Sequence, residues 1–286
     1  MREPWELLTS GPEDAERGVL LLPGGANAAR SFDLVMADAA LSGVRLVSTT
    51  MPGMAGAPVT GDVSVPGLAR TSADLAGEHG CDVVVGFSHG ATVALEMLLS
   101  GAFHGPVVLL GISLTTEDEA GFFRGVVRLS QRIGSWPMSL LLTMVPLMAR
   151  SAKIPEPHKS ELVEDLKQNR GKDAVRLCAG YLDHIDADRD YAAEIAAAGS
   201  PVWVVHAEKG DGGLTDKERA TLEAAANVTL VTIPGSVFLL PDEAPGQVAA
   251  AIAAAVASTP PPRRVSSPSV QPGPGRGAGA TRGSGS

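Results

Sequence analysis

Short apolar runs alternate with stretches of helical composition along most of the chain. The apolar runs are continuous rather than alternating with polar residues, which is typical of strands buried on both faces of a sheet. Strands are therefore predicted at residues 18–22, 44–48, 81–85, 106–112, 201–205 and 228–233. Helices are predicted at residues 28–41, 68–78, 91–100, 215–226 and 245–257. This alternation predicts an α/β fold, with a mostly parallel central sheet covered by helices on both faces.

The alternation stops between the fourth and fifth predicted strands, where only helical patterns occur. One helix there has a strong apolar side, and residues 138–148 are apolar almost all round. The apolar side of the first helix consists of Phe122, Phe123, Val126, Val127 and Leu129. These side chains either pack on one another and on the core, or line an apolar pocket in which methionines adapt to a hydrophobic ligand. The charged residues from 159 to 172 are expected on a solvated helix face.

The pattern divides the chain of 286 residues into a core, an insertion and a tail. We expect an α/β core at 1–113 and 199–257, with an inserted helical cap at 114–198. Residues 258–286 consist almost entirely of Pro, Gly, Ser and Arg, have little to bury, and are expected to be disordered.

Charge and cysteine content exclude several function classes. The formal net charge is −9, and the tail holds four arginines and no acid, so residues 1–257 carry −13. A body this acidic repels phosphate backbones, so we expect no nucleic-acid partner. The two cysteines, Cys81 and Cys178, are far apart and suggest no metal site, and we expect no cofactor.

The sequence shows no segment expected to enter a membrane. The N-terminus has acids and a proline where a signal peptide needs a basic and then an apolar region. The most apolar run, residues 137–148, is too short to span a bilayer and contains Pro146. We therefore expect a cytoplasmic protein with no membrane span.

The residues Gly86-Phe87-Ser88-His89-Gly90 form a G-x-S-x-G pattern between a predicted strand and a predicted helix. A serine at a sharp strand-to-helix turn is pushed out at the top of the sheet, and flanking glycines let the tight backbone pass. The helix that follows points its N-terminus at the site, which favours developing negative charge. Ser88 is therefore a candidate nucleophile.

With this motif in its context, the chain resembles the α/β-hydrolase superfamily from about Val19 to Ala257. The resemblance is carried by the stretches at residues 21–25, 51–56, 86–90, 204–211 and 233–245. It implies that the backbone N–H groups of Gly25 and His89 form an oxyanion hole. It also implies that Asp211, in the Gly-rich loop after a strand, is the acid that orients a catalytic histidine, in the chain order Ser, acid, His.

The chain departs from that pattern at the catalytic histidine. The family places this histidine within a Pro-Gly-Ser-x-Phe-Leu segment, where this chain has Val237, and no histidine lies C-terminal to His206. Serine is a poor nucleophile near neutral pH without an adjacent base. Losing the base of such a triad typically costs roughly four to six orders of magnitude in turnover.

Three histidines are candidates for a substitute base. His184, near the end of the predicted cap, is the best candidate, while His89 and His206 are weaker ones. We interpret the other histidines as surface or loop residues. Carboxylates with an ordinary pKa are weak bases for a hydroxyl. The other histidines are His79, His104 and His158, and the carboxylates that follow the vacant position are Asp242 and Glu243.

Three functions stay open on this evidence. The first is a serine hydrolase of esterase or thioesterase type that acts on a small hydrophobic molecule. The second is a lyase, isomerase or cyclase that uses the oxyanion hole to stabilise an enolate, and the third is an inactive ligand-binding relative. The intact elbow and Asp211 favour the first, and Val237 favours the others. The sequence specifies neither the substrate nor the oligomeric state.

Overall fold

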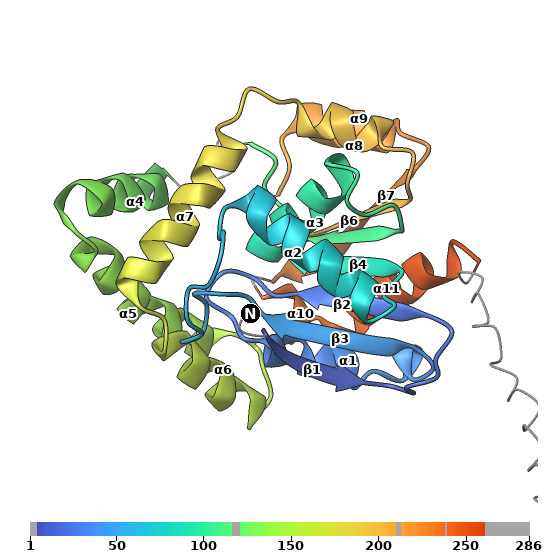
Figure 1. Ribbon diagram of the computed structural model, residues 1–286, viewed down its shortest axis with the longest axis horizontal. Helices are drawn as coiled ribbons and strands as arrows, with labels where there is room; N and C mark the ends of the chain where they lie inside the picture. The colour runs from blue at the N-terminus through green and yellow to red at the C-terminus, as the bar shows by residue number, and fades with distance from the viewer. Residues whose placement is uncertain (1–4, 116–120, 210–212, 238, 261–286) are drawn as a thin grey trace, which may run out of the picture.

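A computed structural model describes residues 5–115, 121–209, 213–237 and 239–260, and shows a central sheet flanked by helices (Figure 1). Asp211 and almost all of the predicted disordered tail lie outside the described residues. Within the described residues the sheet has seven strands in the order β1-β3-β2-β4-β5-β6-β7. The strands are β1 (Glu6–Ser10), β2 (Gly18–Leu22), β3 (Arg45–Thr50), β4 (Val83–Phe87), β5 (Val107–Leu110), β6 (Val202–Lys209) and β7 (Val228–Ser236).

The predicted parallel sheet is confirmed from β3 to β7, and every strand predicted from the sequence is present. Strand β1, which the sequence did not predict, pairs antiparallel with β3 at the edge of the sheet. Its five residues are exposed or half-buried, so they lack the continuous apolar run that marks the inner strands.

Side chains of the inner strands alternate between two cores, as the two-residue period of a strand requires. Val19 and Leu21 of β2 pack on one face of the sheet, in a cluster that includes helices α1 (Asp33–Met36), α10 (Leu240–Glu243) and α11 (Pro245–Ala257). Leu20 and Leu22 pack on the other face, against α2 (Val65–Glu78) and α3 (His89–Leu99). Burial on both faces explains why β2, β4 and β5 contain no polar side chains.

The helix predicted at residues 28–41 is wrong in extent. The structure divides it into η1 (Ala29–Phe32), α1 and η2 (Ala39–Leu41). Asp38 interrupts the segment because its backbone is extended and its side chain accepts a hydrogen bond from the N–H of Ala40, which caps η2 instead of continuing α1. Helix α9 (Asp216–Glu223) covers the sheet near β7.

Between β5 and β6 the described residues form helices and no strand. The helices are α4 (Gly121–Ile133), α5 (Trp136–Ser151), α6 (His158–Lys167), α7 (Gly171–Ile185) and α8 (Tyr191–Ala197). Helices α4, α5 and α7 share a small apolar cluster of their own, built on Val127, Met138, Leu182 and Ile185. Together with α6 they extend from one end of the molecule in Figure 1.

Helix α6 packs on the sheet core through Leu162, Val163 and Leu166. The expected solvated face at 159–172 is therefore wrong in part, because Asp165 is buried and forms an ion pair with Arg30 of η1. None of the described helices is long and apolar enough to cross a bilayer.

Candidate active site

The turn from β4 into α3 presents Ser88 at the surface. Ser88 has φ 49° and ψ −116°, a left-handed conformation that non-glycine residues rarely adopt, and its side chain is exposed. The turn is held on both sides, because the Ser88 N–H donates to the Leu110 carbonyl at 2.8 Å and the Ser88 carbonyl accepts from the N–H of Ala91 at 2.8 Å. Such strain persists only where the surrounding structure imposes it, and it is frequent at active sites.

Gly86 and Gly90 of the motif lie too close to neighbouring backbone atoms to carry a side chain. A Cβ placed on Gly86 would lie 2.2 Å from the Gly90 carbonyl oxygen. A Cβ on Gly90 would lie 2.1 Å from the carbonyl oxygen of Leu22 in the neighbouring strand. Both distances are far shorter than a van der Waals contact, so α3 can approach β2 and β4 this closely only without these side chains.

The loop after β2 lies beside the start of α3. Gly25 is exposed, and a Cβ placed on it would lie 3.8 Å from the Cβ of His89. The loop is a tight turn in which the Asn27 N–H donates to the Gly24 carbonyl at 3.2 Å and Ala26 has a positive φ of 69°. The structure thus brings the two predicted oxyanion-hole residues together, next to Ser88.

Asn169, just after α6, fixes this loop from the side of the inserted helices. Its Nδ2 donates to the Ala26 carbonyl at 2.8 Å, and its Oδ1 accepts from the Ala55 N–H at 2.9 Å. Asn169 therefore ties the loop that carries Gly25 to the loop after β3. This role could not be predicted from the sequence, because nothing in a lone asparagine of a polar segment indicates a contact across the fold.

The His89 side chain is buried below the elbow. Its ring meets the Tyr181 ring edge-on, with centroids 5.7 Å apart, and its Nε2 makes no hydrogen bond with a described residue. Burial, with a smaller contribution from nearby His184, lowers the pKa of His89 to about 4. The imidazole is therefore neutral near pH 7, and its backbone N–H is the part of His89 that can face an oxyanion.

His184 on α7 is also buried, and its Nε2 lies 3.9 Å from the Glu96 carboxylate. Glu96 is eight residues along α3 from Ser88, which corresponds to a rise of about 12 Å. The His184 ring packs against Tyr191 with centroids 5.3 Å apart, and burial lowers its pKa although Glu96 opposes this. The Nε2 atom of this candidate base thus lies nearest the C-terminal half of α3, away from Ser88, and it makes no hydrogen bond with a described residue.

Val237, at the position that the resemblance assigns to the catalytic histidine, belongs to the core. Its N–H donates to the Lys209 carbonyl at 2.9 Å, and its half-buried side chain packs against the cluster on the α1 and α11 face of the sheet. His206 is buried within β6. Asp211, the predicted acid, lies outside the described residues.

The interpretation of His158 as a surface or loop residue is wrong. His158 begins α6, is buried, and its Nε2 lies 2.8 Å from Oδ1 of buried Asp242 on α10. This hydrogen bond raises the pKa of His158 despite its burial, whereas burial raises the pKa of Asp242. The pair joins an inserted helix to the segment that follows Val237. The sequence could not reveal it, because 84 residues separate the partners.

We expect His158→Gln to destabilise the fold in a pH-dependent way. The pKa of His158 is raised in the folded state, so its stabilising charge is fully present below the ordinary value of about 6.5 and is lost as the pH rises through the folded value. Removing one partner of a buried pair costs about 3 kcal/mol. Thermal unfolding should show a larger loss at about pH 6 than at about pH 9. Exposed His104→Gln is the control, and an equal loss at both pH values would refute the charged pair.

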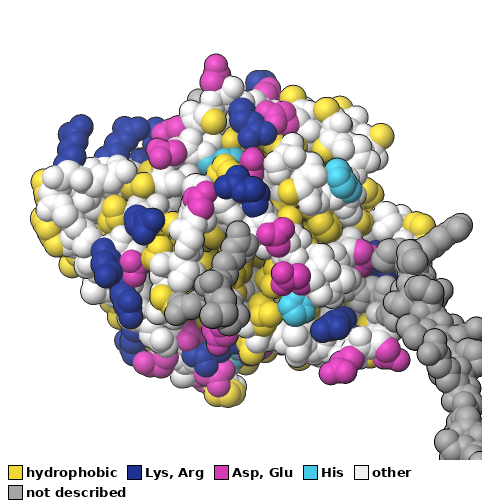
Figure 2. Space-filling view, in the orientation of Figure 1, with side chains coloured by type: hydrophobic (Ala, Val, Ile, Leu, Met, Phe, Trp, Pro, Cys, Tyr) yellow, Lys and Arg dark blue, Asp and Glu magenta, His cyan; other side chains and the backbone are white. Residues whose placement is uncertain are grey.

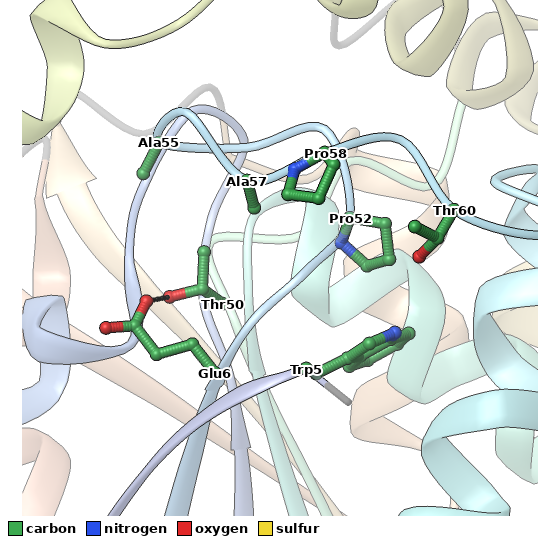
Figure 3. A pocket seen from close by; sticks show the side chains of 8 residues that line it. All are labelled: Trp5, Glu6, Thr50, Pro52, Ala55, Ala57, Pro58 and Thr60. Atoms are coloured by element: carbon green, nitrogen blue, oxygen red, sulfur yellow. Dashed lines mark hydrogen bonds between the residues drawn. The ribbon is translucent and has the colours of Figure 1, made fainter. Parts of the chain in front are cut away.

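A hollow of about 440 Å³ opens beside β1, the strand at the edge of the sheet (Figure 3). Trp5 and Glu6 form one side of it, and the loop after β3 forms the other. The Thr50 hydroxyl donates to Glu6 Oε2 at 2.7 Å and accepts from the Ala29 N–H at 2.9 Å. Thr50, which lines the hollow, thus contacts Ala29 in the segment that follows Gly25, but none of the predicted site residues that the structure describes lines the hollow.

Comparisons with known proteins agree with this geometry. The model of the "Alpha/beta hydrolase family" matches residues 19–251. No curated protein sequence matches the chain. Among solved structures, a thermophilic esterase from Thermogutta terrifontis, crystallised with malate, is 16% identical with a TM-score of 0.66, over 87% of this chain and 91% of that one.

Two further structures show the same likeness. A hydrolase from Oleispira antarctica is 13% identical, with a TM-score of 0.68 over 88% of this chain and 94% of that one. The thioesterase domain from the curacin biosynthetic pathway is 16% identical, with a TM-score of 0.60 over 86% of this chain and 94% of that one. At these identities the likeness establishes the fold.

Proposed function

The chain belongs to the alpha/beta hydrolase family, and on that basis we propose that it is a serine-dependent esterase or thioesterase for a small hydrophobic substrate. The observation that carries the proposal is the position of Ser88. Its exposed side chain stands on a strained turn at the N-terminus of α3, with Gly25 beside His89.

In the proposed reaction the Ser88 oxygen attacks the carbonyl carbon of an ester or thioester. The carbonyl oxygen becomes an oxyanion, which accepts hydrogen bonds from the N–H groups of His89 and Gly25. Collapse of this intermediate expels the alcohol or thiol and leaves an acyl group on Ser88, and water then releases the acid. The N-terminal end of α3 adds a favourable partial charge at the oxyanion.

The proposed reaction needs an acceptor for the proton of Ser88. Val237 cannot accept a proton, and the Nε2 atoms of His89, His158 and His184 make no hydrogen bond to Ser88. We therefore propose that turnover is slow and relies on ionisation of Ser88 with solvent as the proton acceptor. The rate should then rise steadily with pH rather than titrate with a histidine near pH 6.5.

A hydrophobic acyl group is the substrate class that the inserted helices favour. Residues of α4, α5 and α7 form an apolar cluster, and Tyr181 of α7 contacts His89 beside the elbow. An acyl chain placed against the partly buried apolar side chains around this cluster, next to Tyr181, would lose water-exposed surface on binding.

A second candidate function is non-hydrolytic: enolate stabilisation in a lyase, isomerase or cyclase, or ligand binding without catalysis. The packing of Val237 against the core favours it, because the position that the resemblance assigns to the catalytic histidine holds an apolar side chain rather than a base. An oxyanion hole can act on a carbonyl oxygen without covalent attack by serine.

Hydrolysis of 4-nitrophenyl esters and of acyl thioesters of increasing chain length tests the proposal. We expect slow turnover that increases with chain length and with pH from about 6 to 9, and that falls at least about tenfold in Ser88→Ala. Ser100→Ala, at the exposed end of α3, is the control and should keep the activity. Equal rates in the natural chain and in Ser88→Ala would refute the nucleophile and favour the second candidate.

A further inference from the structure

Helices α4 and α5 expose large apolar side chains on one side of the molecule. Seven such residues, with exposed fractions between 44% and 71%, define what we name the α4–α5 face. They are Phe122, Leu129, Ile133, Trp136, Leu140, Met144 and Leu147. Figure 2 shows hydrophobic side chains along the end of the molecule where these helices lie, with Lys and Arg side chains beside them.

The face follows from helical spacing. On α5, Trp136, Leu140, Met144 and Leu147 are separated by three or four residues, so they form one stripe along the helix. The opposite side of α5 packs inward through Met138. Soluble domains rarely expose an apolar stripe of this kind, and such a stripe marks a surface that contacts another protein or a membrane.

Charge is distributed unevenly around the same face. Residues 121–153 contain five cations and no acid, although the whole chain carries −9. The cations are Arg124, Arg128, Arg132, Arg150 and Lys153. Asp186 lies 3.3 Å from Arg124 and 3.9 Å from Arg128, while Arg132 and Arg150 form no ion pair with a described residue. Three acids at positions 117–119 precede α4 and lie outside the described residues.

A hollow of about 280 Å³ continues the stripe toward Arg150 and one further cation, Lys167. Leu142 and Leu147 of α5 line it together with Arg150 and Lys167. Lys167 also pairs with Glu164 on α6. Apolar side chains next to guanidinium and ammonium groups match a ligand with an acyl chain beside an anionic head group.

We infer that the α4–α5 face binds the surface of an anionic lipid bilayer. Its apolar side chains enter the boundary between head groups and acyl chains, and its arginines contact the lipid phosphates. A second copy of the chain is a poorer occupant, because a two-fold contact would oppose the same cations across the interface. The inference concerns binding and does not depend on Ser88 chemistry.

Vesicle sedimentation with the full chain tests the inference. We expect binding to vesicles that contain phosphatidylglycerol, weaker binding to pure phosphatidylcholine, and release at about 0.5 M salt, where surface charges are screened. The double variant Leu140→Ser with Met144→Ser should lower vesicle affinity about tenfold or more. Both side chains are exposed, so the fold should be unaffected, which circular dichroism checks.

Two matched controls separate the contributions. Leu140→Met with Met144→Leu keeps the apolar surface and should keep binding, whereas Arg132→Gln should weaken binding and Lys217→Gln, exposed on α9, should not. The inference is overturned if the natural chain ignores anionic vesicles or if the serine variant binds equally. A third result would also overturn the inference. If the natural chain binds no vesicle but forms a concentration-dependent dimer that the serine substitutions abolish, the α4–α5 face binds a second copy of the chain.

Discussion

Val237→His should raise ester hydrolysis by about two orders of magnitude or more at neutral pH. The Ser88 hydroxyl, the turn around it and the neighbouring backbone donors are already in place, so a base is the component that the site needs. Loss of the base from a complete triad costs roughly four to six orders of magnitude. We expect only part of this range to return, because a grafted imidazole lacks an optimised orientation. The rate should also acquire an inflection near pH 6.5.

The matched control is the double variant Val237→His with Ser88→Ala. Serine and histidine act as a unit, so the gain from histidine should vanish when the serine is absent. The Val237 side chain packs on the core, so the same replacement should also be made at Phe238, the next position in the chain. A gain of equal size in the Ser88→Ala background, or no gain at either position, would contradict Ser88 as the nucleophile.

Gly90→Ala should destabilise the protein by about 3 kcal/mol or more and abolish any activity of Ser88. The added Cβ would lie 2.1 Å from the Leu22 carbonyl oxygen, and both groups belong to the backbone, so neither can move aside alone. Helix α3 would have to shift away from β2, which would displace Ser88 and the N–H of His89. Urea unfolding monitored by circular dichroism measures this loss.

Gly77→Ala provides the comparison for this measurement. Gly77 is exposed in α2, and a Cβ placed there would meet nothing within 4 Å. Alanine favours the helix and restricts the unfolded chain, so this variant should be more stable by about 0.5–1 kcal/mol. Similar stability of the two variants would mean that α3 does not approach β2 as closely as the structure shows.

Local patterns predicted the fold and the elbow. The runs at residues 18–22 and 81–85 are apolar without interruption because both faces of β2 and β4 are buried, so composition alone marked them as inner strands. Gly86 and Gly90 predicted a tight turn because glycine has no Cβ to clash with nearby backbone. The structure needs glycine at both positions for that same reason. The strand, turn and helix are contiguous in the chain, so their geometry is encoded locally.

Contacts between distant segments could not be predicted in this way. The pairing of His158 with Asp242 and the tie from Asn169 to Ala26 join an inserted helix or its end to parts of the core far away in sequence. Neither contact has a motif. His158 was interpreted as a surface or loop residue, and it is buried because of a partner, Asp242, that the sequence does not identify. Strand β1 was missed because an edge strand has no continuous apolar run.

The central claim, that Ser88 is a nucleophile held beside an oxyanion hole, is tested most directly by covalent labelling. The natural chain is incubated with a fluorophosphonate probe across a range of pH, and the adduct is located by mass spectrometry of its peptides. We predict a single adduct on Ser88 that forms faster as the pH rises, forms fastest in Val237→His or Phe238→His, and is absent from Ser88→Ala. An adduct elsewhere, or no adduct on Ser88 in any of these chains while they remain folded, would contradict the account.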